Sequence, residues 1–218
     1  MKPQRISVVI LAILLSGTVG CQRAYFGALE AIGMPKRELF VKRVEAAREA
    51  QAEGKEEFRD ALEQFRAVIE VDGGDLAEQY DVLSARLERS ENRAEDIKER
   101  IEAVESVSEA LFSEWEDELD DYTNAKLRSK SERSLEQTRN RYERLIAAMH
   151  KAESKIPPVL EPLRDQVLYL KHNLNARAVA SLDQELVQIE GRVDTLIEEM
   201  EEAIAEADRF IATMEEVS

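Results

Sequence analysis

Residues 179–217 read VASLDQELVQIEGRVDTLIEEMEEAIAEADRFIATMEEV, and this stretch decides the fold. Its apolar residues follow one another at alternating steps of three and four, which predicts a long amphipathic helix because such positions share one helix face. Ile197, Ile204 and Ile211 widen the apolar stripe, so this helix should pack on two neighbours. The stepping residues are Val179, Leu182, Leu186, Ile189, Val193, Leu196, Met200, Ala203, Ala207, Phe210, Met214 and Val217.

The same pattern recurs in three earlier stretches. It is clear within residues 58–69, 76–115 and 135–174, where the third run changes phase after Ile156. Polar or glycine-containing segments separate the runs, and few helix breakers occur inside them. We therefore expect helices near residues 35–71, 76–122, 131–174 and 178–216.

Local signals refine these boundaries. Pro157, Pro158 and Pro162 should kink or split the third helix. Ser129 and Glu132 have the spacing of a capping box, which favours a helix start there. Asn173 and Asn175 tolerate the left-handed conformation, which suits the end of that helix.

Near-equal helices with short turns predict an all-α fold, an elongated antiparallel bundle or coiled coil of three to four long helices. The alternative to four packed helices is a three-helix body with part of the first helix loosely attached. Charge supports antiparallel pairing, because residues 101–125 carry nine acids and no Lys or Arg, whereas residues 125–156 carry nine Lys and Arg against four acids. The last helix is acidic too, so a basic third helix should lie between two acidic ones.

Composition excludes several functions. The chain has 218 residues and a net charge of −16, which argues against nucleic-acid binding. It has one Cys and two His, and it lacks a phosphate-binding loop, a zinc-protease motif and the Glu-x-x-His pair of di-iron bundles. The turn at residues 72–75 lacks the spacing of an EF-hand. We therefore expect no catalytic residues, no metal and no cofactor.

The N-terminus has the features of an export signal. Residues 1–20 combine Lys2 and Arg5, a short apolar run and a small-residue exit, which is typical of a signal peptide. Residues 18–21, Thr-Val-Gly-Cys, resemble the lipobox of bacterial lipoproteins, although the family usually has Leu where this chain has Thr18. The resemblance implies acylation of Cys21, a lipidated segment at residues 21–34, and, from Gln22, sorting to the outer membrane. Plain secretion and an uncleaved anchor are the alternatives.

A second resemblance covers most of the remaining chain. GMPKRELFVKRVEAAR at residues 33–48, VDGGDL at 71–76 and VLYLKHNLNARAVASL at 167–182 resemble a family of uncharacterised bacterial lipoproteins labelled only as a domain of unknown function. The resemblance runs from about Tyr25 to Met214. It implies no activity, cofactor or functional residue.

The functional expectation is therefore a non-enzymatic, lipid-anchored cell-envelope protein that faces the periplasm. It would act as a helical spacer or adaptor for an unknown envelope protein. The alternative is a ligand- or metal-binding helical bundle with a sensing role. The oligomeric state is open.

Two surfaces are candidate sites. Basic residues near the lipidated end should face an anionic membrane, with ordinary ion pairs inside the bundle as the alternative. The turns at residues 72–75 and 172–177 should share the end farthest from the lipid, where they either contact a partner or close the bundle. The basic residues are Arg23, Lys36, Arg37, Lys42, Arg43 and Arg48; the distal residues are Asp72, Asp75, Lys171, His172, Asn173, Asn175 and Arg177.

Overall fold

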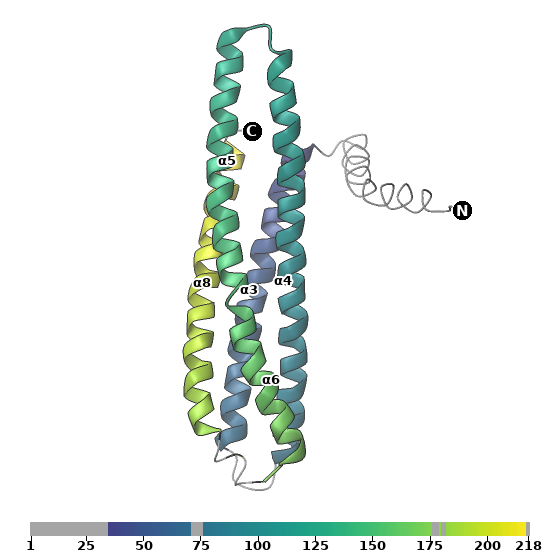
Figure 1. Cartoon of the computed structure of the whole chain (residues 1–218), viewed down its shortest axis with the longest axis vertical. Helices are drawn as coiled ribbons and strands as arrows, with labels where there is room; N and C mark the ends of the chain where they lie inside the picture. The colour runs from purple at the N-terminus through teal and green to yellow at the C-terminus, as the bar shows by residue number, and fades with distance from the viewer. Residues whose placement is uncertain (1–34, 71–75, 176–178, 180–181, 217–218) are drawn as a thin grey trace, which may run out of the picture.

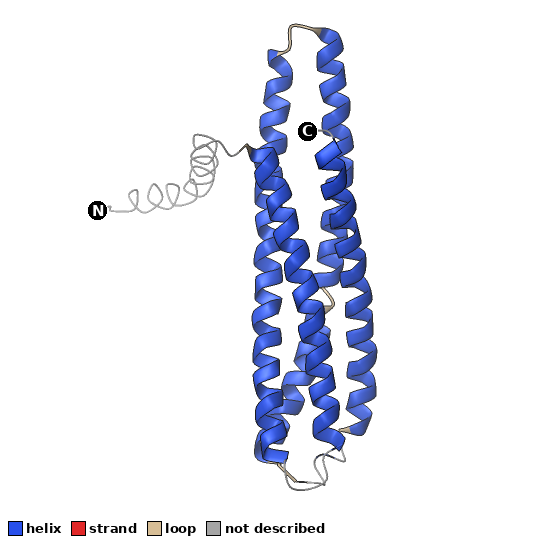
Figure 2. Cartoon of the chain, turned by 180° about the vertical axis from the view of Figure 1, so that it is seen from behind, coloured by secondary structure: helices blue, strands red, loops and turns tan. Residues whose placement is uncertain are grey.

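The computed structural model describes residues 35–70, 76–175, 179 and 182–216. Within these ranges the regular structure is helical (Figures 1 and 2). Helix α4 has 43 residues, so it is about 65 Å long at 1.5 Å per residue. The elements are α3 (Lys36–Glu70), α4 (Leu76–Glu118), the 3-10 turn η1 (Leu119–Asp121), α5 (Ala125–Glu153), α6 (Ile156–His172) and α8 (Asp183–Glu216).

The helices form an antiparallel up-down-up-down bundle. Helix α3 packs along α4 and α8, and α5 with α6 completes the bundle between α4 and α8. In Figure 1, α6 lies in front of α3, and Figure 2 shows α3 in front from the other side. The predicted all-α bundle is confirmed in its four-helix form, because the first half of α3 contributes buried residues such as Phe40 and Val44.

The predicted apolar stripes line the core. Of the stepping residues in the C-terminal run, Leu186 is partly buried, Val217 lies outside the described residues, and the others are buried. One aromatic cluster joins all four helices near the start of α3. The Phe40 ring centroid lies 6.0 Å from that of Phe112, 5.8 Å from Tyr142 and 5.1 Å from Phe210.

The third helix is split where the prolines predict. Helix α5 ends at Glu153 and α6 begins at Ile156, with prolines in its first turn. Proline has no backbone N–H, so its place at the start of α6 costs no helical hydrogen bond. Pro162 remains inside α6.

Two local predictions about the start of α5 are wrong. Helix α5 starts at Ala125, not near residue 131, because the Asn124 carboxamide oxygen accepts the N–H groups of Lys126 and Leu127. The Ser129 hydroxyl instead accepts a bond from Arg133 Nη1 at 2.8 Å, so it caps no helix start.

The end of α6 also differs from expectation. Asn173 caps α6 at φ −136°, which is not left-handed, and its side-chain amide donates to the Tyr169 carbonyl at 2.9 Å. Leu174, expected in the seam, is 41% exposed, because α6 ends at His172 and the chain leaves the stripe there.

Helices α4 and α5 run on beyond the start of α3 and the end of α8 (Figures 1 and 2). The first residue of α3, Lys36, forms an ion pair with Glu114 at 3.0 Å. Residues 115–121 therefore extend about 10 Å past that contact, and there α4 packs on α5 without α3.

Candidate functional site

The helix ends that border residues 72–75 and 172–177 lie together at one end of the rod. The ends of α3 and α6 and the starts of α4 and α8 lie together there (Figure 1). The predicted alternation of ends is therefore confirmed for the helices. Several candidate residues lie outside the described ranges, namely Cys21, Arg23, Asp72, Asp75 and Arg177.

The C-terminal end of α6 is held by backbone hydrogen bonds. The Asn173 N–H donates to the Leu170 carbonyl at 3.0 Å, and the Asn175 N–H donates to the Asn173 carbonyl at 2.8 Å. Asn173 thus serves as a cap, while Lys171 and His172 are exposed at the last turn. A capped helix end with the exposed side chains of Lys171 and His172 is the part of the predicted site that the structure describes.

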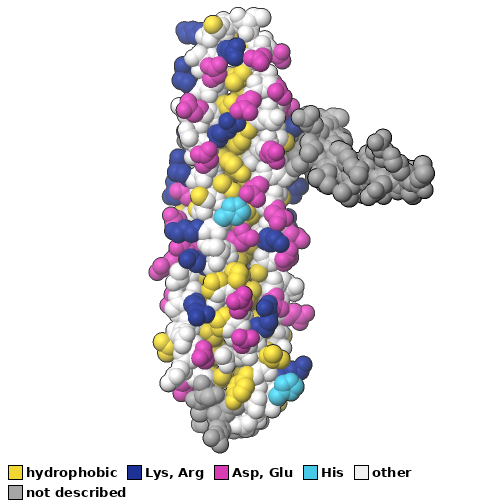
Figure 3. Space-filling view, in the orientation of Figure 1, with side chains coloured by type: hydrophobic (Ala, Val, Ile, Leu, Met, Phe, Trp, Pro, Cys, Tyr) yellow, Lys and Arg dark blue, Asp and Glu magenta, His cyan; other side chains and the backbone are white. Residues whose placement is uncertain are grey.

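The same end exposes large apolar side chains that sequence reasoning missed. Five of the seven exposed large hydrophobic residues in the described ranges lie near it. Figure 3 shows hydrophobic side chains along the whole visible face, this end included. Leu168 and Tyr169 fall outside the seam of α6, and that off-seam position is the signal that could have found them. The five are Val82 at 40% exposure, Leu168 at 58%, Tyr169 at 43%, Leu174 at 41% and Val187 at 67%.

The candidate membrane-facing cations make contacts within the bundle. Lys36 pairs with Glu114, and the Arg37 guanidinium donates to the Met214 carbonyl at 2.9 Å. The remaining cations on α3 behave similarly. Lys42 pairs with Glu38 at 2.7 Å, Arg48 pairs with Asp208 on α8, and Arg43 is half-buried.

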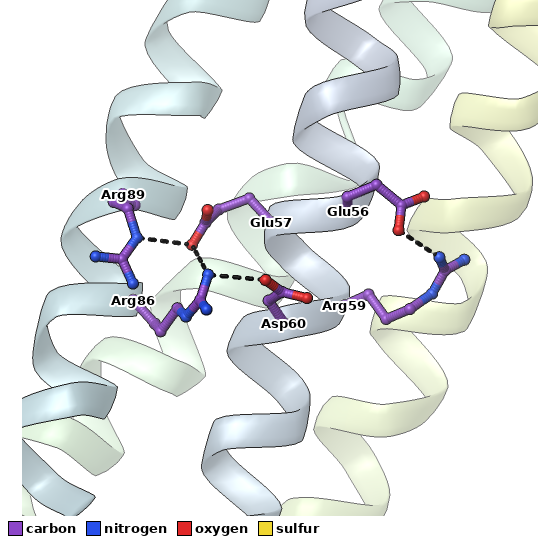
Figure 4. A network of polar contacts seen from close by, with 6 residues as sticks. All are labelled: Glu56, Glu57, Arg59, Asp60, Arg86 and Arg89. Carbon is purple, nitrogen blue, oxygen red and sulfur yellow. Dashed lines mark hydrogen bonds and ion pairs between the residues drawn. The ribbon is translucent and has the colours of Figure 1, made fainter.

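Ion pairs also link neighbouring helices along the rod. In Figure 4, Arg86 and Arg89 of α4 both approach Glu57 of α3, at 3.5 and 3.3 Å. Arg86 also reaches Asp60 at 2.8 Å, and Arg59 pairs with Glu56 on α3 itself at 2.7 Å. Each partly exposed pair contributes about 0–1 kcal/mol, so the network favours one register more than it adds stability.

The predicted pairing of basic α5 with acidic neighbours is present. Arg139 of α5 contacts Glu116 of α4 at 2.9 Å. On the other side, Lys151 contacts Glu199 of α8 at 2.8 Å and Glu202 at 3.2 Å. Hydrogen bonds to these two carboxylates raise the pKa of Lys151.

His150 lies between two carboxylates. Its Nε2 is 2.9 Å from Glu105 of α4, and its Nδ1 is 3.0 Å from Glu153, one turn along α5. Partial burial opposes protonation, but the hydrogen bonds to Glu105 and Glu153 outweigh it and raise the pKa of His150 above 6.5. The i, i+3 spacing of His150 and Glu153 was readable in the sequence, whereas the pairing with Glu105 was not.

Two open grooves lie on the described surface. One of about 420 Å³ lies beside the start of α3, with Val41 and Met214 in its wall. Another of about 300 Å³ lies between α4 and α6, beside Ala94 and Ile156. Across the described residues, no group of three His, Cys, Asp or Glu could hold a metal ion, and no helix is long and apolar enough to cross a membrane.

These features define a rod-like, all-α protein built on one four-helix bundle. The chain belongs to the family described as "Protein of unknown function (DUF2959)", which matches residues 25–214. No curated protein and no solved structure matches the chain.

Proposed function

We propose that this protein is a non-enzymatic, lipid-anchored spacer or adaptor of the cell envelope, and that its end farthest from the anchor binds a protein partner. The observation that carries the proposal is the concentration of exposed large apolar side chains at one end of the rod. Leu168 and Tyr169 are adjacent on α6, and adjacent exposed apolar side chains suit contact with a protein partner.

The arrangement of the termini supports the anchored part of the proposal. Helix α3 starts toward the end of the rod opposite to that apolar group. Cys21 precedes Lys36 by fifteen residues, which can span at most about 50 Å when extended. An acyl chain on Cys21 would therefore hold the start of α3 near a membrane. The bundle would carry the apolar end away from it, by about 50 Å along the 35 residues of α3.

The test changes the proposed anchor, Cys21, and the exposed apolar residue Leu168 in separate variants. Cys21→Ser should move the protein from the membrane to the soluble fraction, or leave an uncleaved precursor of higher mass. Leu168→Glu should leave fractionation unchanged but abolish crosslinking to the partner in membranes. Leu127→Glu is the matched control, because Leu127 is 52% exposed near the other end and its change should leave the crosslink intact.

Two results would contradict the proposal. A Cys21→Ser protein that fractionates and migrates like wild type would refute the lipid anchor. Equal crosslinking by the Leu168→Glu and wild-type proteins would refute binding through the distal end.

A further inference from the structure

The outward face of α6 has an ordered sequence of charges and apolar groups. Glu161, Asp165 and His172 are separated by four and seven residues, so they lie on one stripe of the helix. Leu168 and Tyr169 flank this stripe between Asp165 and His172. All five are exposed, and the opposite face of α6 contributes Ile156, Val159, Leu160, Leu163, Val167 and Leu170 to the core. We call these five residues the α6 ridge.

The charged groups of the α6 ridge are unpaired within the described part of the chain. Glu161, Asp165 and His172 form no ion pair there, and neither does the adjacent Lys171. By contrast, Arg164 on the flank of α6 pairs with Glu91 of α4. The ridge therefore offers acids at its N-terminal half, apolar groups at its centre and bases at its C-terminal half.

We propose that the α6 ridge binds the α6 ridge of a second copy of this chain, with the two α6 helices antiparallel about a two-fold axis between residues 168 and 169. In a two-fold interface, each contact occurs twice with the partners exchanged. Asp165 then faces His172 and Lys171 of the other copy. Leu168 faces Tyr169 of the other copy, so both apolar groups become covered.

The order of charges along the α6 ridge favours a second copy as the partner and an antiparallel orientation of the two α6 helices. An acidic partner would be repelled by Glu161 and Asp165, and an anionic membrane likewise, whereas a basic partner would meet Lys171 and His172. A second copy running the opposite way satisfies both halves of the ridge at once. A parallel pairing would place Asp165 against its own copy, which costs stability.

The contact has the size of one helix pair. Helix α6 has 17 residues, so it is about 25 Å long and about 10 Å wide. Such an interface covers about 250 Å² per copy, which is below the range of stable complexes, so the association should be weak and concentration-dependent.

The dimer would change the reach of the protein, a consequence that rests on the proposed function. Helix α3 spans about 50 Å from its start to the end that carries the ridge. An antiparallel pair joined near that end places the two starts of α3 roughly 90 Å apart, at opposite ends of the complex. The pair would be a strut with a lipid anchor at each end.

Charge exchange tests the proposal on the purified full chain under reducing conditions. The first variant, Glu161→Lys with Asp165→Lys, makes the ridge wholly basic. The second, Lys171→Glu with His172→Glu, makes it wholly acidic. Sedimentation velocity should show a concentration-dependent dimer for wild type and at least tenfold weaker self-association for each variant. An equimolar mixture of the two variants should dimerise again, because their ridges are complementary.

Direction is tested by cysteine pairs in a Cys21→Ser background. Asp165→Cys protein should form a disulfide with His172→Cys protein far more readily than with itself. Circular dichroism should give the same melting curve for every variant, because the changed side chains are exposed.

Three results would overturn the proposal. They are a wild-type chain that remains monomeric at 100 µM, variants that dimerise as strongly as wild type, and a mixture that does not regain association. None of these measurements depends on lipid at Cys21, so failure of the dimer and failure of the anchor are distinguishable. Loss of anchoring on Cys21→Ser with an intact dimer would leave this inference standing.

Discussion

His150 connects α5 to α4 through a contact whose strength depends on protonation of its ring. Its ring contacts Glu105 on α4 and Glu153 on α5, and these carboxylates raise its pKa above 6.5 despite partial burial. A raised pKa means that the folded state favours the protonated ring. The resulting stabilisation is complete below about pH 6.5, where the unfolded chain also begins to bind the proton. It is lost as the pH rises through the folded-state pKa.

We expect His150→Gln to remove this dependence. The difference in free energy of unfolding between wild type and His150→Gln should shrink as the pH is raised from about 6.5 to 8.5. Urea denaturation at several pH values measures it. A His150→Gln difference that does not change with pH would show that the two carboxylates do not bind the ring in solution.

The contact between α3 and α4 depends on a glycine. A Cβ atom on Gly54 would lie 2.6 Å from Ile97 Cδ1, and Ile97 is itself only 1% exposed. On α8, a Cβ atom on Gly191 would meet nothing within 4 Å. The two glycines are therefore a matched pair that separates helix propensity from packing.

Gly191→Ala should raise the free energy of unfolding by about 0.5–1 kcal/mol, because alanine loses less backbone entropy in a helix. Gly54→Ala should instead lower it by about 1–2 kcal/mol, because Ile97 must move in a packed core. Urea midpoints of the two variants measure both effects. An equal gain from both substitutions would mean that α3 and α4 approach less closely than the 2.6 Å contact at Gly54 requires.

The rod does not have the same cross-section throughout. Four helices pack over most of its length, but beyond Glu114 helix α4 packs on α5 without α3. Trp115 lies at this transition, where its Nε1–H donates to the Ser131 hydroxyl at 2.8 Å. Because it is the single Trp of the chain, its fluorescence reports on the environment at this transition.

We expect this two-helix part to open before the bundle unfolds, because fewer buried apolar contacts hold it. The urea midpoint from Trp115 fluorescence should lie below the midpoint from far-ultraviolet circular dichroism. Ser131→Ala should lower the fluorescence midpoint further and leave the dichroism midpoint nearly unchanged. Coincident midpoints in both proteins would show instead that the whole rod unfolds as one unit.

The helical fold and its order were predictable from sequence alone, because a period of three and four residues reports which face of a helix is buried. Val193, Leu196 and Met200 illustrate this, since all three are buried where the stripe places them. The split of the third helix was equally readable, because proline acts on its own backbone. The capping error at Ser129 arose because Asn124, a few residues earlier, offers the same hydrogen bond.

The contacts between helices could not be predicted from the sequence. They depend on how each helix is shifted along and rotated about its axis relative to its neighbours, and the apolar period within one helix does not specify either. Gln51, which no sequence pattern singles out, is fully buried, and His150 meets Glu105, 45 residues away. The exposure of Leu168 and Tyr169 was equally hidden, because an apolar residue beside a seam can lie under a neighbouring helix or face solvent. Only the packing of α6 against α4 and α8 determines that this side faces outward.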